Sequence, residues 1–143
     1  DMKRLILLIL TILPSIAMAY DDGFTDLVDR YSSEKGFTTI RLSKDMLQSM
    51  GVSNGINQME VIALEDTKHI ERFQADVKSI TDGLKVVMSV NSGDEIVKIF
   101  SKSCDSGAIY EMVIFTSDGN EAVLIRLLGD NIQLKEATQM INF

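Results

Sequence analysis

The stretch LKVVMSVNSGDEIVKIFSKSCDSGAIYEMVIFTSDGNEAVLIRLL, residues 84–128, contains four apolar runs separated by short polar turns. The runs are rich in β-branched and aromatic residues, which favour strands. They span residues 84–90, 95–102, 108–116 and 121–128. Between them lie Ser92-Gly93, Ser106-Gly107 and Asp118-Gly119, pairs that suit two-residue hairpin loops because Gly tolerates positive φ. The stretch therefore predicts an antiparallel meander of four strands.

Two-residue loops would set the pairing of the strands, and the alternation of side chains then sorts them onto two faces. One face is almost purely apolar, so we expect it to form the core. It carries Leu84, Val86, Met88, Val90, Val97, Ile99, Tyr110, Met112, Ile114, Val123, Ile125 and Leu127.

The opposite face of the meander is mixed and supplies the candidate binding residues. In this register Lys102, Glu111 and Arg126 face one another across three strands, an arrangement in which opposite charges stabilise a sheet. The row beside them consists of Phe100, Val113 and Leu124. Two interpretations stay open: helices of the same chain cover this apolar row, or it is an exposed patch for a partner or a second copy.

The rest of the chain adds helices and two strands, so the predicted class is α+β with a mainly antiparallel sheet. The four-strand meander, residues 84–128, is expected to pack against the helices. Apolar residues at helical spacing predict one amphipathic helix from Phe24 to Tyr31 and another from Ile70 to Ile80. The further elements are strands at 37–42 and 59–64, a short helix capped by Ser43, and a terminal helix that directs Leu134, Ala137 and Ile141 inward.

Residues 1–19 have the pattern of a secretory signal peptide. Lys3-Arg4 is a basic start, residues 5–13 form an apolar run, and Ala17-Met18-Ala19 is a small-residue cleavage motif. That run would span about 14 Å as a helix, which is much less than the roughly 30 Å of a bilayer core. We therefore expect cleavage before Tyr20, a periplasmic or secreted protein without a transmembrane segment, and a single domain of residues 20–143.

The chain is acidic. Its net charge of −7 becomes −8 when Asp1, Lys3 and Arg4 are lost with residues 1–19. Nucleic acids and anionic membrane surfaces attract basic proteins. The charge balance therefore argues against both as partners and is typical of an exported globular protein.

Residues typical of catalysis are sparse. His69 is the only histidine and Cys104 the only cysteine, so the chain cannot form an internal disulfide. We interpret His69 as a solvated helix residue rather than a metal ligand. Cys104 is either an incidental turn residue or a reactive thiol for an intermolecular disulfide. Because nucleophile, phosphate and dinucleotide motifs are also missing, the sequence predicts no catalytic residue, no metal site and no cofactor.

Several segments together resemble domain-of-unknown-function family 4252. They are the helix at 24–31, the segment at 39–46, the strand at 59–64, and the ending at 123–132 with Gly129, which is followed by a helix. Members of that family are small exported proteins of Bacteroidetes-type bacteria, so the resemblance implies a Gram-negative envelope location. Many relatives look like lipoproteins, whereas this chain lacks a lipid-accepting cysteine after its apolar run. The resemblance implies no catalytic residues.

These observations favour a non-enzymatic periplasmic interaction or binding module that uses one sheet face. Its binding residues would be Phe100, Val113, Leu124, Lys102, Glu111 and Arg126, and its partner an envelope protein or a second copy. The alternative is a small-ligand-binding protein or a hydrolase with an acidic site, which requires a pocket that gathers carboxylates, His69 or Cys104. A third hypothesis is a dimer joined through sheet edges or Cys104.

Overall fold

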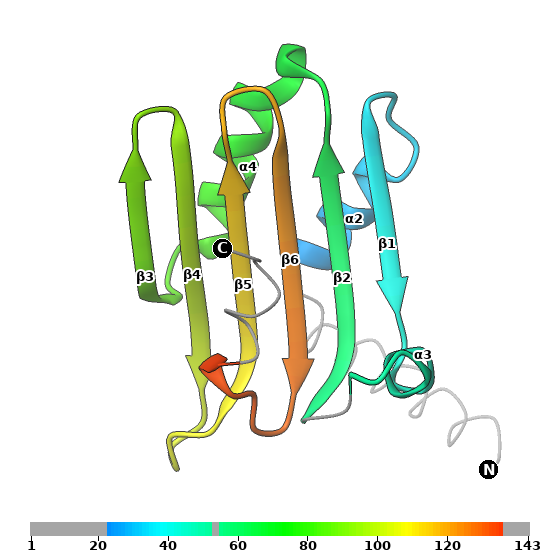
Figure 1. Cartoon of the computed structure of the whole chain (residues 1–143), viewed down its shortest axis with the longest axis vertical. Helices are drawn as coiled ribbons and strands as arrows, with labels where there is room; N and C mark the ends of the chain where they lie inside the picture. The colour runs from blue at the N-terminus through cyan, green and yellow to red at the C-terminus, as the bar shows by residue number, and fades with distance from the viewer. Residues whose placement is uncertain (1–22, 53–54, 136–143) are drawn as a thin grey trace, which may run out of the picture.

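Six antiparallel strands form one sheet in the computed structural model, which describes residues 23–52 and 55–135 (Figure 1). The strands lie in the order β1-β2-β6-β5-β4-β3. Their bounds are β1 Phe37–Leu42, β2 Ile56–Leu64, β3 Lys85–Ser92, β4 Glu95–Ser103, β5 Ile109–Ser117 and β6 Ala122–Gly129. The predicted α+β class and the antiparallel meander are therefore confirmed. The predicted signal peptide and most of the predicted terminal helix lie outside the described residues.

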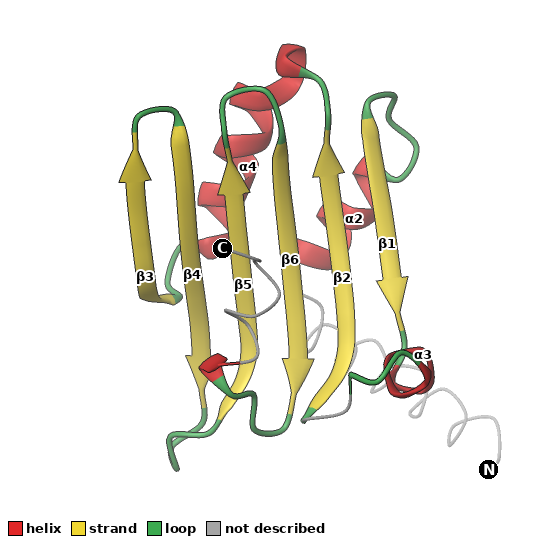
Figure 2. Cartoon of the chain, viewed as in Figure 1, coloured by secondary structure: helices red, strands yellow, loops and turns green. Residues whose placement is uncertain are grey.

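The helices cover the sheet unevenly (Figure 2). Helix α2 (Gly23–Tyr31) and helix α4 (Ile70–Thr81) lie behind the sheet in this view, on the same face. The short helix α3 (Lys44–Ser49) lies at the lower end of β1 and β2, and a 3-10 turn, η1 (Thr67–His69), leads into α4. Ser43 caps α3 as predicted, since its hydroxyl accepts from the Met46 backbone N–H at 3.4 Å.

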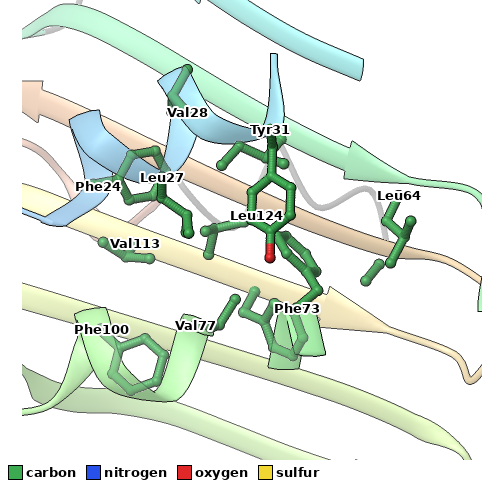
Figure 3. Close-up of a cluster of buried hydrophobic side chains, with 13 residues drawn as sticks. Phe24, Leu27, Val28, Tyr31, Leu64, Phe73, Val77, Phe100, Val113 and Leu124 are labelled. Carbon is green, nitrogen blue, oxygen red and sulfur yellow. The ribbon is translucent and has the colours of Figure 1, made fainter. Parts of the chain in front are cut away.

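The spacing of apolar residues explains why α2 and α4 lie flat on this face. Each helix buries one stripe of side chains, and both stripes meet the same side of the sheet (Figure 3). The buried cluster consists of Phe24, Leu27, Val28, Tyr31, Ile62, Leu64, Phe73, Val77, Phe100, Val113, Phe115, Ala122 and Leu124. This cluster is called the helix-side core below.

A second core lies on the other face of the sheet. Ile99, Met112, Ile114 and Leu127 are fully buried there, in a cluster with Leu47, Ile56 and Ile132. This face, called the second face below, is the one that the sequence predicts to be the core. Its edges are less enclosed than predicted, because Val90 and Tyr110 are exposed.

Turn length decides the pairing between neighbouring strands. The β4–β5 register is as predicted, with Phe100 opposite Val113 and Lys102 opposite Glu111. Between β5 and β6, however, Val113 lies opposite Arg126 rather than Leu124. The loop between β5 and β6 is two residues longer than predicted, since Ser117 pairs with Ala122. The Asp118 carboxylate stabilises this longer loop, because it accepts from the backbone N–H groups of Asn120 at 3.0 Å and Glu121 at 2.8 Å. The shift is by an even number, so each side chain keeps its face.

The β3–β4 hairpin departs further from the prediction. Ser92 pairs with Glu95, and an irregularity between Val86 and Met88 shifts the rest of the register. Such a bulge moves the residues before it to the opposite face. Leu84 therefore packs against the helix-side core, and Val86 lies opposite Phe100, although both are predicted on the second face.

A buried ion pair ties α2 to the middle of the sheet. Arg126 on β6 lies opposite Glu60 on β2, and its Nε donates to Glu60 Oε1 at 3.1 Å. The guanidinium stacks 4.7 Å from the ring centre of Phe24 on α2. Arg41 approaches the second Glu60 oxygen at 3.5 Å, and Glu111 lies 3.7 Å from Arg126. The predicted ladder of Lys102, Glu111 and Arg126 is therefore corrected, because Glu60 is the main partner of Arg126.

Removing one member of this ion pair should be more harmful than removing both. We expect Arg126→Met to lower the free energy of unfolding by about 3 kcal/mol, because it leaves the Glu60 carboxylate buried with reduced compensation. The double variant Glu60→Leu/Arg126→Met should recover much of this loss, since Arg41 keeps its 2.7 Å ion pair with Asp29. Urea unfolding of the three proteins measures both effects. Equal stability of the single variant and the native chain would contradict this account.

Candidate functional site

The apolar row that the sequence offers as a binding surface lies inside the protein. Phe100, Val113 and Leu124 are only 7%, 1% and 0% exposed, and α2 and α4 lie over them (Figure 3). The expectation of an exposed patch is therefore corrected. The physical reason is that two amphipathic helices need an apolar surface to cover their buried stripes, and this sheet face provides it.

The three charged candidates have different surroundings. Arg126 is buried in its ion pair with Glu60. Lys102 is exposed and Glu111 half-buried, and both line a small cavity of about 140 Å³ near the end of α4. The structure thus keeps Lys102 and Glu111 together as predicted, and Val113 of the apolar row lines the same cavity.

A larger groove lies between α4 and the β3–β4 hairpin, with a volume of about 470 Å³. This is within the size range of small-molecule sites. Its walls are mainly apolar. They comprise Val77 of α4, Leu84 and Val86 near the start of β3, Ile96 and Phe100 of β4, and Phe115 of β5. Five polar side chains also line it, namely Gln74, Lys78, Thr81, Asp82 and Lys98.

Local chain geometry explains why the groove opens here. Helix α4 ends at Thr81, and Gly83, with φ +88°, lets the chain turn directly into β3. The bulge then directs Val86 toward the helix side, where it is 53% exposed. In Figure 1, α4 lies behind β4 and β5, whereas β3 forms the edge of the sheet beyond it. The apolar surface at this edge is therefore only partly covered.

The charges at the groove are not balanced. Lys78 is exposed and Lys98 is half-buried. Neither lysine ammonium group takes part in an ion pair or hydrogen bond within residues 23–52 and 55–135. Asp82 is the one acidic residue that lines the groove in this part of the chain. The groove thus carries a local excess of positive charge in a chain whose net charge is −7.

Polar contacts with α2 hold α4, which forms one wall of the groove. The Tyr31 hydroxyl donates a hydrogen bond to Asp76, and Arg30 lies 3.4 Å from the same carboxylate. Arg72 forms a 2.6 Å ion pair with Glu34, just after α2. These contacts set the position of α4 near its first turns.

Tyr31 has an unusual acidity because of this environment. Burial, followed by the hydrogen bond and the negative charge of Asp76, raises the pKa of Tyr31 to about 12 from its ordinary value of 10.0. Its ring stacks on Phe37 at 4.1 Å between centres and meets the edge of Phe73 at 5.5 Å. The phenol is thus stabilised in its neutral form in the folded state.

The raised pKa of Tyr31 predicts a pH dependence of stability. Because the folded-state pKa is above the unfolded one, the contribution of the phenol is present below pH 10 and is lost as the pH rises toward 12. The difference in unfolding free energy between the native chain and Tyr31→Phe should therefore be constant up to about pH 10 and then decrease. Urea unfolding of both proteins across this range tests it, and effects of lysine titration cancel in the comparison. A difference that stays constant to pH 12 would contradict the assignment.

The residues considered for catalysis do not come together. The η1 turn that carries His69 lies at the upper end of the sheet in Figure 1, whereas the β4–β5 loop with Cys104 lies at the lower end. Cys104 is exposed, with its sulfur 2.9 Å from the Ser106 hydroxyl, and this hydrogen bond lowers the pKa of the thiol. No group of three metal-ligating side chains occurs among residues 23–52 and 55–135. The groove contains neither His69 nor Cys104.

The sequence contained one signal of the groove, because Lys98 shares its predicted face in β4 with Ile96 and Phe100. Sequence reasoning still missed the groove for two reasons. The predicted register placed Val86 and Leu84 on the opposite face, and nothing in the local pattern located α4 relative to the hairpin. The groove depends on both features.

Comparison with known proteins assigns the chain to a family. The sequence model of the DUF4252 domain, a domain of unknown function, matches residues 31–140. The chain belongs to this family. The predicted resemblance is thus confirmed, and all residues that line the groove lie within the DUF4252 domain. Searches of curated proteins and of solved structures found no match. Across the described part of the DUF4252 chain, no helix is long and apolar enough to cross a membrane.

Proposed function

We propose that this protein is a non-enzymatic binding protein whose groove between α4 and the β3–β4 hairpin holds a free amphiphile. The ligand would have an apolar body and an anionic end group, as a fatty acid has. The observation that carries this proposal is the apolar groove bordered by two lysines, Lys78 and Lys98, that have no charged partner in the described residues.

The apolar part of the groove supplies the driving force. Val77, Leu84, Val86, Ile96, Phe100 and Phe115 all contribute to its surface. Each methylene group that a ligand buries there contributes about 0.8 kcal/mol. Val86 is the most useful probe, because it is exposed in the free protein and would be covered by a bound chain.

The polar border supplies selectivity. Lys78 and Lys98 outnumber Asp82, so the border favours a negative end group over a positive one. The chain as a whole is acidic, which disfavours docking on an anionic bilayer and favours a single dissolved ligand. The row of Phe100, Val113 and Leu124, which the sequence offers as a surface for a partner protein, is buried under α2 and α4. We therefore assign the binding role to the groove.

Binding of cis-parinaric acid, a fluorescent fatty acid, to the full chain tests the proposal. We expect Val86→Asp and Lys98→Glu each to weaken binding at least about tenfold, because they place a charge in the apolar wall or reverse the favourable one. The matched controls are Val90→Asp, on the same strand but on the second face, and Lys68→Glu in η1, away from the groove. Fluorescence titration of the native chain and the four variants measures the five dissociation constants.

The neutral methyl ester of the same fatty acid separates the two parts of the proposal. Lys98→Glu should weaken binding of the acid far more than binding of the ester, whereas Val86→Asp should weaken both. No binding by the native chain, or equal losses in test and control variants, would refute the groove as the site.

We also infer that the protein acts in the periplasm or outside the cell. The support is the basic start at Lys3-Arg4, the apolar run of residues 5–13 and the Ala17-Met18-Ala19 motif. Expression of the full sequence in a Gram-negative host, fractionation and N-terminal sequencing test this. We expect a periplasmic product that begins at Tyr20, and an uncleaved cytoplasmic chain would overturn the inference.

A further inference from the structure

The small cavity of about 140 Å³ beside Lys102 adjoins the groove. Asp82 and Leu84 line both spaces, so the turn from α4 into β3 separates them. Their floors are neighbours as well, because Phe100 of the groove pairs with Val113 of the cavity across β4 and β5 (Figure 3). Groove and cavity therefore follow one another along the helix side of the sheet.

Leu84 is the apolar part of the partition between the two spaces. Its backbone N–H donates to the Thr81 carbonyl at 3.1 Å, which fixes the turn directly after α4. Its side chain is half-buried and packs against the helix-side core. Within the described residues, it is the one apolar side chain that lines both the groove and the cavity. A single leucine side chain can change rotamer without a movement of α4 or the sheet.

The surface of the cavity suits the end of a hydrocarbon chain. Its apolar residues are Phe24 of α2, Ile80 of α4, Leu84 and Val113 of β5. Phe24 and Val113 are buried, so the inner wall is apolar and well packed. Each methylene group that enters such a wall strengthens binding about fourfold.

The charges at the cavity have the opposite balance from those at the groove. Two acidic residues, Asp82 and Glu111, line the cavity together with one basic residue, Lys102. The pair of Arg126 and Glu60 behind Glu111 adds one charge of each sign and leaves this excess unchanged. An anionic group is therefore favoured at the lysines of the groove and disfavoured in the cavity.

We propose that the cavity is the inner end of the ligand site and holds the end of the apolar chain, while the anionic group stays between Lys78 and Lys98. This inference rests on the binding function proposed above. Lys98 and Lys102 are four residues apart on the same side of β4, which corresponds to about 13 Å. The site thus selects long chains, because a short one fills the groove alone and a longer one passes Leu84 into the cavity.

Titration calorimetry of the full chain with octanoic and palmitic acids, below the concentrations at which they aggregate, tests the length dependence. We expect palmitic acid to bind the native chain more tightly. Lys102→Trp, whose indole ring would fill the mouth of the cavity, should weaken binding of palmitic acid at least about tenfold and leave octanoic acid unchanged. The controls are Lys102→Met, which removes only the charge, and Ser103→Trp, which lines neither space. Both should leave the two affinities unchanged.

The charge at the far end of the chain tests the direction of binding. A diacid of the same length as palmitic acid should bind at least about tenfold more weakly, because its second carboxylate enters an apolar cavity with an excess of negative charge. The analogue that ends in an ammonium group should bind more tightly than the diacid. A diacid that binds as tightly as palmitic acid would overturn the proposed direction.

The outcomes separate this inference from the function on which it rests. If neither acid binds the native chain, both fail. If the acids bind with equal affinity, or if Lys102→Trp weakens both by the same factor or neither, the groove stands and the role of the cavity is overturned. If circular dichroism shows that Lys102→Trp unfolds, Leu84→Ala replaces it. Removal of the partition should then raise the affinity for palmitic acid relative to octanoic acid, and an unchanged ratio would refute the proposal.

Discussion

A sheet that is apolar on both faces must be covered twice, and this constraint organises the whole protein. One face meets the buried stripes of α2 and α4. The other holds a second cluster around Met112 and Ile114. Because a helix covers a strip of limited width, the edge at β3 is only partly protected. The groove at this edge is therefore a direct consequence of how the apolar surface is covered.

The buried charges add specificity to this packing. Glu60 and Arg126 lie in the helix-side layer, where an uncompensated charge would be costly. Their pairing requires β2 beside β6, and the contact of Arg126 with Phe24 requires α2 above both strands. A buried pair of this kind does little for net stability by itself, but it penalises other strand orders.

Much of the fold could be predicted, because the alternation of side chains in a strand and the spacing of apolar residues in a helix are patterns of neighbouring residues. The helix from Phe24 to Tyr31, the four strands of the meander and the β4–β5 register follow from neighbouring residues. The site could not be predicted in the same way. An apolar row of Phe100, Val113 and Leu124 looks identical whether helices or water cover it, since the sequence pattern records apolar character and not the covering element.

The amino-acid sequence by itself determined most of the elements, the fold class and the faces on which most side chains of the meander lie, because each of these depends on residues within one or two turns or strands. Only the tertiary structure decided what lies over each face. The Asp118 turn and the bulge at Val86–Met88 changed the pairing, and long-range packing placed β2 next to β6 and α4 beside the hairpin. The groove forms between elements that are far apart in the chain, and the free energy of packing such elements depends on surfaces that no local sequence pattern brings together.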